Sequence, residues 1–200
     1  MKKKKGTVTT IIFLVILASA IFGIYYFARF KADERAKKQA EKNAQPTEIS
    51  QILDLNIDAN YPDTARTVLR LYGRIVSAML NEELKDGELR KLESQLRRLF
   101  DVEFLLNNSE DEQFNALNLE RNDYRDHKRT VDSYLVDSAG NAEHKVIDGR
   151  ECYSALVNFV VKENGISSTL YEEFLLRRDD TGKWKILGWR RVDKDGVAVD

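Results

Sequence analysis

The sequence predicts an α+β domain behind a single transmembrane helix. Three observations lead to this fold class. An uncharged, mostly apolar run follows four lysines at the N-terminus. Apolar residues then recur at the helical spacing of three or four between residues 64 and 124, and they alternate at the strand spacing of two from residue 130 to residue 192. Helices followed by an antiparallel meander predict helices packed on one face of a sheet.

The apolar run is long enough to be a membrane anchor. It begins at Thr7 and ends at Ala28, about 22 residues, which as a helix would reach about 33 Å and cross a hydrocarbon core of about 30 Å. Residues 18–20, Ala-Ser-Ala, have the small side chains of a signal-peptide cleavage site, so cleavage is the alternative. The run exceeds the roughly 7–15 apolar residues of a signal peptide. We therefore expect an uncleaved anchor that contacts membrane lipid from Thr7 to Ala28.

Charge divides the chain and sets the expected orientation. Residues 1–46 carry 10 basic and 3 acidic side chains, a net charge of +7, whereas residues 47–200 carry 22 and 30, a net charge of −8. The cluster from Lys2 to Lys5 favours a cytoplasmic N-terminus and an extracytoplasmic domain, although the other flank of the apolar run is also basic. An acidic domain argues against nucleic-acid binding, which uses a clustered basic surface.

The predicted organisation has five parts. The stem is rich in Ala, Lys, Glu and Gln, which favours a helix, and a solvated flexible tether is the alternative. The residues beyond it are numerous enough for one domain with its own core. The parts are a cytoplasmic basic N-terminus (1–6), the transmembrane helix (7–28), the stem (29–46), the α+β domain (47–193) and a tail (194–200).

Three helices are expected in the first half of the domain. Asp63 or Thr64 can cap the first, Asp86 can cap the second near Gly87, and the third covers residues 110 to about 124. The apolar segment 102–106 has no assigned state. Apolar stripes at helical spacing give the residues expected to face the core: Val68, Tyr72, Ile75, Val76 and Met79, then Leu89, Leu92, Leu96 and Leu99, then Phe114 and Leu117.

About four strands are expected in the second half. They cover residues 130–136, the alternating stretch 153–161, and the stretches 166–178 and 183–192. Asn164-Gly165 between two of them is the strongest short hairpin signal, because both turn residues need positive φ. Residues 180–182, Asp-Thr-Gly, predict the next turn, and the residues from Asp193 onward look like a loose tail.

Two sequence stretches give a resemblance to known proteins. Residues 179–186, Asp-Asp-Thr-Gly-Lys-Trp-Lys-Ile, resemble the last hairpin of the nuclear-transport-factor-2-like superfamily, whose curved sheet wraps around helices as a cone. Residues 60–64, Asn-Tyr-Pro-Asp-Thr, together with Gly188-Trp189, resemble an uncharacterised family of membrane-anchored proteins from Gram-positive bacteria. The resemblance covers most of residues 54–192. It implies a cone-shaped domain and no assigned activity, since this fold hosts enzymes, binders and scaffolds.

Enzymes of the fold that this chain resembles use an acid or histidine as base and a tyrosine or acid as oxyanion donor in the cone. The candidates here are Asp132, Tyr134, Tyr153 and His127. The alternative, which we favour, is that the tyrosines are core aromatics and that Asp132 and His127 lie on the surface. We therefore assign no catalytic residue.

Metal and cofactor chemistry has little support. His127 and His144, the two histidines of the chain, are not at metal-ligand spacing, and the lone Cys152 adds no cluster. No glycine-rich phosphate loop or serine elbow is present. We expect neither a metal site nor a bound cofactor, and we interpret Cys152 as a small packing residue.

The last two strands suggest a partner surface. Their arginine pairs, 177–178 and 190–191, lie near acidic pairs, which favours cross-strand ion pairing over a rim for an anionic partner. Apolar residues occur on both faces of these strands, so the outer face could bind a second copy or an envelope protein. These residues are Leu170, Phe174, Leu176, Trp184, Leu187 and Trp189.

The expected function is therefore that of a non-catalytic module of the bacterial envelope, anchored in the membrane and extracytoplasmic, which binds a protein or a small ligand. The alternative is an enzyme of the polyketide-cyclase or dehydratase type that uses the cone pocket. The interior of the cone separates these hypotheses: an open pocket with convergent polar groups favours a ligand or a substrate, and a filled cone favours a scaffold.

Overall fold

The computed structural model describes residues 29–31, 33–35, 46–137 and 143–199. The chain divides into two units, Met1–Gln45 and Pro46–Asp200. In the first unit, the described residues 29–31 and 33–35 are helical. The predicted transmembrane helix, residues 7–28, lies outside the described residues. Among the residues that are described, no helix is both long and apolar enough to cross a membrane.

The second unit begins with helices, as the sequence predicts. The three predicted helices correspond to α3, α4 and α6, and the unassigned apolar segment forms the short helix α5. The sequence does not reveal α2, because six residues are too few to show a repeating apolar stripe. The helices are α2 (Glu48–Leu53), α3 (Ala65–Asn81), α4 (Glu88–Arg97), α5 (Val102–Asn107) and α6 (Glu110–Asp126).

Helix α3 is the central helix of the layer and lies against the sheet. Thr64 caps it, since its hydroxyl accepts a hydrogen bond from the Thr67 backbone and the two residues form a capping box. Gly73 faces the Tyr134 ring so closely that an added Cβ would come within 2.6 Å of it. A glycine at this position therefore lets the helix approach β1 (Arg129–Val136).

The antiparallel sheet has five strands rather than four. The four predicted strands are β1, β3 (Arg150–Glu163), β4 (Ile166–Arg178) and β5 (Trp184–Val192), hydrogen-bonded in the order β1-β3-β4-β5. The additional strand β2 (Glu143–Ile147) pairs with β3. All five residues of β2 are exposed, so it lacks the alternation that reveals a strand in a sequence.

Tight turns join the long strands. The predicted Asn164-Gly165 turn has φ angles of 50° and 84°, and Asp148-Gly149 between β2 and β3 has 51° and 76°. Positive φ at both residues matches the twist of the flanking strands, which explains an asparagine or aspartate followed by glycine. In the turn before β5, the Asp179 carboxylate accepts hydrogen bonds from the backbone of Thr181 and Lys183.

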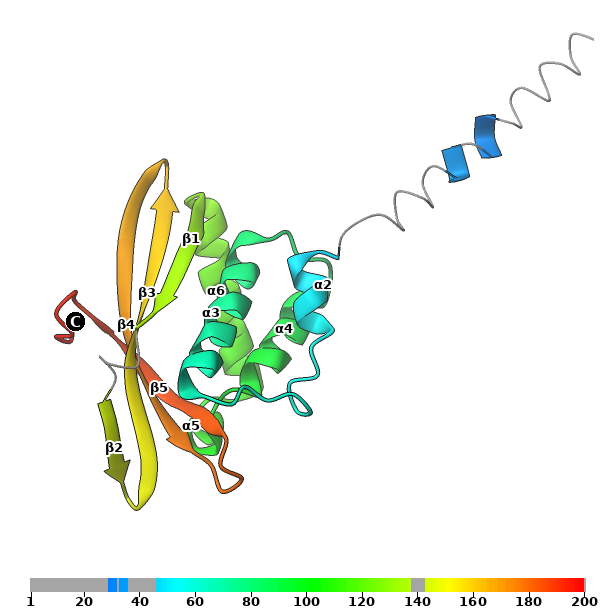
Figure 1. The fold of residues 1–200 in the computed structure, drawn as a ribbon. Helices are drawn as coiled ribbons and strands as arrows, with labels where there is room; N and C mark the ends of the chain where they lie inside the picture. The colour runs from blue at the N-terminus through cyan, green and yellow to red at the C-terminus, as the bar shows by residue number, and fades with distance from the viewer. Residues whose placement is uncertain (1–28, 32, 36–45, 138–142, 200) are drawn as a thin grey trace, which may run out of the picture. The chain divides into compact units, whose positions relative to one another are not determined.

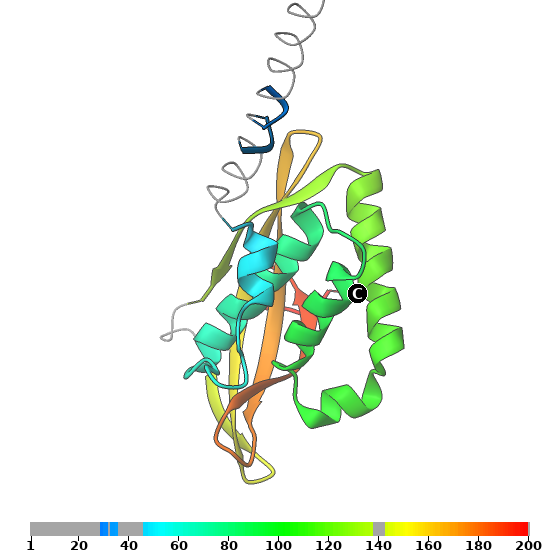
Figure 2. The ribbon, with the colours of Figure 1, turned by 90° about the vertical axis from the view of Figure 1, so that its right-hand side faces the viewer.

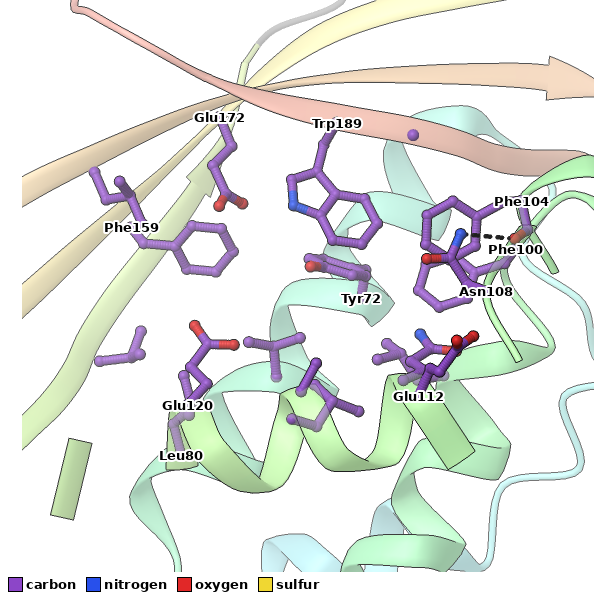
Figure 3. A pocket seen from close by; sticks show the side chains of 18 of the residues that line it. Tyr72, Leu80, Phe100, Phe104, Asn108, Glu112, Glu120, Phe159, Glu172 and Trp189 are labelled. Carbon is purple, nitrogen blue, oxygen red and sulfur yellow. Dashed lines mark hydrogen bonds between the residues drawn. The ribbon is translucent and has the colours of Figure 1, made fainter. Parts of the chain in front are cut away.

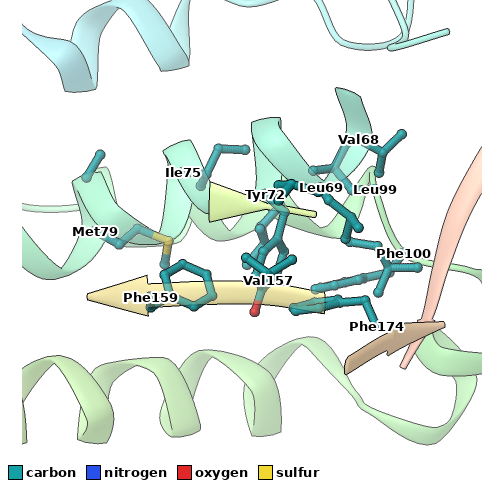
Figure 4. Close-up of a cluster of buried hydrophobic side chains, with 14 of the residues drawn as sticks. Val68, Leu69, Tyr72, Ile75, Met79, Leu99, Phe100, Val157, Phe159 and Phe174 are labelled. Atoms are coloured by element: carbon teal, nitrogen blue, oxygen red, sulfur yellow. The ribbon is translucent and has the colours of Figure 1, made fainter. Parts of the chain in front are cut away.

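The helices of this unit lie on one face of the sheet, as the two ribbon views show (Figures 1 and 2). The predicted α+β class is therefore confirmed. Between the two layers lies the apolar core, in which α3 packs on β3 and β4 (Figure 4). Its fully buried members include Leu69, Ile75, Met79, Phe174 and Ile186.

A β-bulge changes which face β5 presents. Leu175 pairs with Gly188 and Leu176 pairs with Ile186, so Leu187 is an extra residue on β5. Trp189 consequently pairs with Phe174 and lies on the face covered by helices, as do Trp184 and Ile186. Strict alternation would have placed Trp189 on the outer face, so the tryptophan no longer supports an outer interface.

After β5 the chain turns back on itself, where the sequence predicts a loose tail. The Asp193 carboxylate accepts hydrogen bonds from the backbone of Asp195 and Val197. Ala198 then forms an antiparallel bridge with Val192.

Candidate functional site

A cavity of about 710 Å³ lies between the helices and the sheet. This volume is within the range of about 300–1,000 Å³ that is typical of small-ligand sites. Helices α3, α4, α5 and α6 line one side of the cavity, and strands β1, β3, β4 and β5 line the other. The lining residues are Tyr72, Val76, Leu80, Leu96, Phe100, Phe104, Asn107, Asn108, Glu112, Gln113, Ala116, Leu117, Glu120, Tyr124, Val131, Phe159, Leu170, Glu172, Gly188 and Trp189.

Aromatic rings form one end of the cavity. Trp189 stacks on Phe100 and on Phe174, with ring centroids 5.9 Å and 5.7 Å apart and planes inclined by 19° in both cases. Phe104 and Tyr72 lie 5.3 Å and 5.9 Å from the same indole. Trp189 is nevertheless 38% exposed, because part of its surface faces the cavity. The β5 bulge therefore supplies the cavity with a large accessible aromatic face.

Glu172 brings a carboxylate into the apolar layer. It lies on β4 opposite Val157 of β3, in the row of residues that includes Leu170 and Phe174 and faces the helices. Burial, and then the neighbouring Glu120, raise the pKa of Glu172 to about 7 against the opposing effect of Arg191. Near neutral pH this carboxyl group is therefore partly protonated.

Glu120 approaches the same space from α6. Figure 3 shows the carboxyl groups of Glu120 and Glu172 pointing into the cavity from opposite walls. Water reaches Glu120 through the cavity, yet the surrounding protein is close enough that burial raises the pKa of its carboxyl group. Because like charges repel, two neighbouring carboxyl groups resist simultaneous ionisation.

Tyr72 is the third polar residue, after Glu172 and Glu120, that faces this part of the cavity. Its side chain on α3 is only 6% exposed, and its hydroxyl makes no hydrogen bond to any residue that the structure describes. Burial, together with Glu172 and Glu120, raises the pKa of this hydroxyl well above its ordinary value. The electrostatic coupling among the three groups agrees with their convergence in Figure 3. A hydroxyl that faces a cavity without a protein partner marks a place where a ligand or water would bind.

The charge of the lining has one sign. Three of the described lining residues are glutamates, and none is lysine, arginine or histidine. Glu112 is the third; Ser109 donates to it in the capping box of α6, and these hydrogen bonds lower its pKa. Arg191, across the strand pair from Glu172, is the cation that acts on the Glu120 and Glu172 carboxyl groups.

The residues that the sequence proposed for catalysis lie elsewhere. Asp132 is exposed at a bulge of β1, and His127 is exposed at the end of α6, where its Nδ1 lies 3.0 Å from the Asp123 carboxylate. Tyr134 is partly buried and donates a hydrogen bond to the Arg70 carbonyl. Neither these three residues nor Tyr153, the fourth candidate, line the cavity.

Tyr153 and Cys152 are both buried on β3. The Tyr153 ring packs against His144 and Trp184, with centroids 5.0 Å and 5.9 Å away. Its buried hydroxyl lacks a hydrogen-bond partner among the described residues. In the part of the chain that the structure describes, no three His, Cys, Asp or Glu side chains are grouped as a metal site.

The arginine pairs behave as the charge pattern predicts. Arg190 binds the Glu173 carboxylate at 2.6 Å on the outer face, and Arg178 binds Glu151 at 2.9 Å. Arg177 makes two hydrogen bonds to the buried Asp101 carboxylate. Cross-strand pairing is therefore confirmed for Arg190 and Arg178, whereas Arg177 pairs with the helical layer.

The sequence contained one usable signal for the site. Glu172 occupies a position that alternates with Leu170, Phe174 and Leu176, so an acidic residue stands where an apolar one is expected. Glu120 carries no comparable signal, because the moderate amphipathic pattern of α6 does not mark the position as enclosed. Tyr72 was placed in the core, and only the structure shows its hydroxyl facing a cavity.

The fold and the site together define an α+β domain with an acidic, aromatic-walled cavity between its layers. The chain belongs to the family described as domain of unknown function DUF6715, whose model matches residues 1–189. No match to the chain was found among curated proteins.

Proposed function

We propose that this chain is a membrane-anchored, extracytoplasmic module of the bacterial envelope that binds a small ligand in its cavity. The observation that carries the proposal is the open cavity, into which the Tyr72 hydroxyl and the carboxyl groups of Glu120 and Glu172 point. A domain that served only as a scaffold would be more stable if larger side chains filled this volume, because unfilled apolar space lowers the stability of the fold. The early helices and the antiparallel meander support the resemblance to the nuclear-transport-factor-2-like cone.

The sequence supports the cellular placement in this proposal. The basic cluster from Lys2 to Lys5 and the apolar run from Thr7 to Ala28 are what an N-terminal anchor with a cytoplasmic end requires. A second copy or an envelope protein bound to the outer sheet face remains a separate proposal, supported by exposed apolar residues such as Leu135.

One observation favours the enzyme as a second candidate. A carboxyl group whose pKa is about 7 can accept and return a proton at neutral pH, which is what general acid–base catalysis of the cyclase or dehydratase type needs. Glu172 would be the base in such an enzyme and Tyr72 a hydrogen-bond donor to the substrate. Conversion of a bound compound into a product would distinguish the enzyme from the binding module.

The test is a ligand screen that compares the natural chain with a variant whose cavity is filled by a larger side chain. The full chain in phosphatidylcholine nanodiscs is screened by ligand-observed NMR against cationic, neutral and anionic fragments. Ala116→Trp fills the cavity from α6, whereas Leu119→Trp adds the same side chain at an exposed position on the same helix that does not line the cavity.

Fragments should bind the natural chain and the Leu119→Trp variant, be lost from the Ala116→Trp variant, and be recovered chemically unchanged. Fragments that bind the Ala116→Trp variant as well as the natural chain would contradict a ligand site in the cavity. A failure of all fragments to bind would contradict it too. Recovery of altered fragments would favour the enzyme.

A further inference from the structure

We infer that the ligand of this cavity is an organic primary ammonium ion with an apolar, aromatic-compatible body. The inference rests on the proposed function and names its ligand class. It draws on three independent properties of the site: the sign of its charge, the number of its acceptors, and the rings beside them.

The sign of the charge excludes most other polar ligands. Glu112, Glu120 and Glu172 line the cavity, and no cationic side chain does so among the described residues. An anionic ligand would add a like charge to a space where burial already raises the pKa of two carboxyl groups. A cation would instead remove the repulsion between Glu120 and Glu172, and both groups could then ionise.

The number of acceptors matches a primary ammonium group. Such a group carries three N–H donors and no acceptor. The Glu120 carboxylate, the Glu172 carboxylate and the Tyr72 hydroxyl are three acceptor groups on three different elements, α6, β4 and α3 (Figure 3). Hydrogen bonds to ionised groups are the stronger kind, so the arrangement orients the ammonium end of the ligand.

The neighbouring rings suit the rest of the ligand. Trp189 and Tyr72 lie 5.9 Å apart beside the carboxyl groups, and an aromatic face attracts a cation that has left water. Phe100 and Phe104 continue the apolar wall. A body of roughly drug size fits the 710 Å³ of the cavity.

The charged groups around Glu172 define the pH range in which an amine should bind. Glu120 and Tyr124 approach it from α6, Tyr72 from α3 and Arg191 from β5. Both carboxyl groups are ionised well above neutral pH, whereas an alkyl ammonium stays charged to about pH 10. Amine binding should therefore be tightest near pH 8–9 and weaken as the pH falls through 7.

The test compares three probes of similar shape and different charge. Isothermal titration calorimetry at pH 8 measures 4-phenylbutylamine, 4-phenylbutan-1-ol and 4-phenylbutanoate against the full chain in phosphatidylcholine nanodiscs, with empty nanodiscs subtracted. The variants are Glu120→Gln and Glu172→Gln, which keep shape and remove charge. Glu173→Gln is the matched control, because Glu173 is adjacent in sequence and lies on the opposite face.

The amine should bind at least about tenfold more tightly than the alcohol, and the carboxylate should bind most weakly. Each cavity variant should weaken amine binding by about tenfold and change alcohol binding by less than about twofold, and Glu173→Gln should change neither. Alcohol or carboxylate binding as tight as that of the amine would overturn the inference and leave the cavity as a ligand site. Failure of all three probes, while other fragments still bind in an Ala116-dependent way, would also overturn the inference but not the proposed function.

Discussion

At the scale of single residues, two adjacent glutamates on β4 illustrate how position decides chemistry. Glu172 faces the helices, where burial raises its pKa to about 7. Glu173 faces the other way, and although burial would raise its pKa, hydrogen bonds from Ser154 and Arg190 outweigh that effect and lower it. The two side chains should therefore affect stability in opposite directions.

We predict that Glu172→Gln stabilises the folded chain at pH 8 by about 1–3 kcal/mol and has no effect at pH 4. Below the pKa of the unfolded chain, near 4.5, both states hold the proton. As the pH rises from there to 7, only the folded state retains it, so stability falls over this range and the substitution removes the loss. Urea unfolding across pH measures the effect.

Glu173→Gln is the control for this prediction. Its lowered pKa contributes stability above the unfolded value, so the substitution should reduce stability at pH 8 and lose its effect as the pH falls. An equal loss of stability from both substitutions would contradict the environment assigned to Glu172.

At the scale of elements, the short helix α5 depends on one buried ion pair. Asp101 is 2% exposed, accepts two hydrogen bonds from Arg177 of β4 and caps α5 through the Glu103 backbone. The adjacent Phe100 forms a parallel bridge with Ile186 of β5. These contacts hold Phe104 and Phe100 in the aromatic wall of the cavity.

We predict that Asp101→Ala lowers the free energy of unfolding by about 2–4 kcal/mol, because it removes the cap of α5 and two hydrogen bonds from the largely buried Arg177 guanidinium, which keeps only the exposed Glu103 carboxylate at 3.1 Å. Thermal or urea unfolding followed by circular dichroism measures the loss. Asp180→Ala, which removes an exposed carboxylate paired with Arg150, should cost no more than about 1 kcal/mol. Similar losses for the two substitutions would show that α5 does not rely on the Asp101 pair.

The elements also show where sequence reasoning succeeds. Helices α3, α4 and α6 and the strands β1, β3, β4 and β5 follow from periodicity, because each buries one face. Strand β2 buries none, and α2 is too short, so both were missed. The register of β5 cannot be predicted from the sequence, because a leucine at position 187 does not indicate a bulge. That register sets the orientation of Trp189, and with it the aromatic end of the cavity.

At the scale of the whole molecule, charge separates a basic N-terminal part from an acidic domain. The family model covers both parts, from residue 1 to residue 189. Under the proposed function, the basic part would suit an anionic membrane surface and the acidic domain would be repelled by it.

We predict that protease added to intact cells degrades the domain and spares cytoplasmic proteins. The density of lysines before the apolar run is the reason, because under the proposed function it would hold the N-terminus inside. Replacing Lys2, Lys3, Lys4 and Lys5 with glutamate should increase the protected fraction, as measured by immunoblotting of the domain. Complete protection of the natural chain would place the domain in the cytoplasm, and a mature chain beginning near Ile21 would show that the anchor is cleaved.

The exposed tryptophan in the aromatic wall allows ligand binding to be followed by the protein's own fluorescence. The chain has two tryptophans: Trp184 is 6% exposed, whereas Trp189 is 38% exposed and faces the cavity. A small neutral quencher such as acrylamide should therefore extinguish the emission of Trp189 and largely spare that of Trp184. A compound that occupies the cavity would shield the accessible indole, so the loss of quenching would count occupied sites without any label on the protein or the compound.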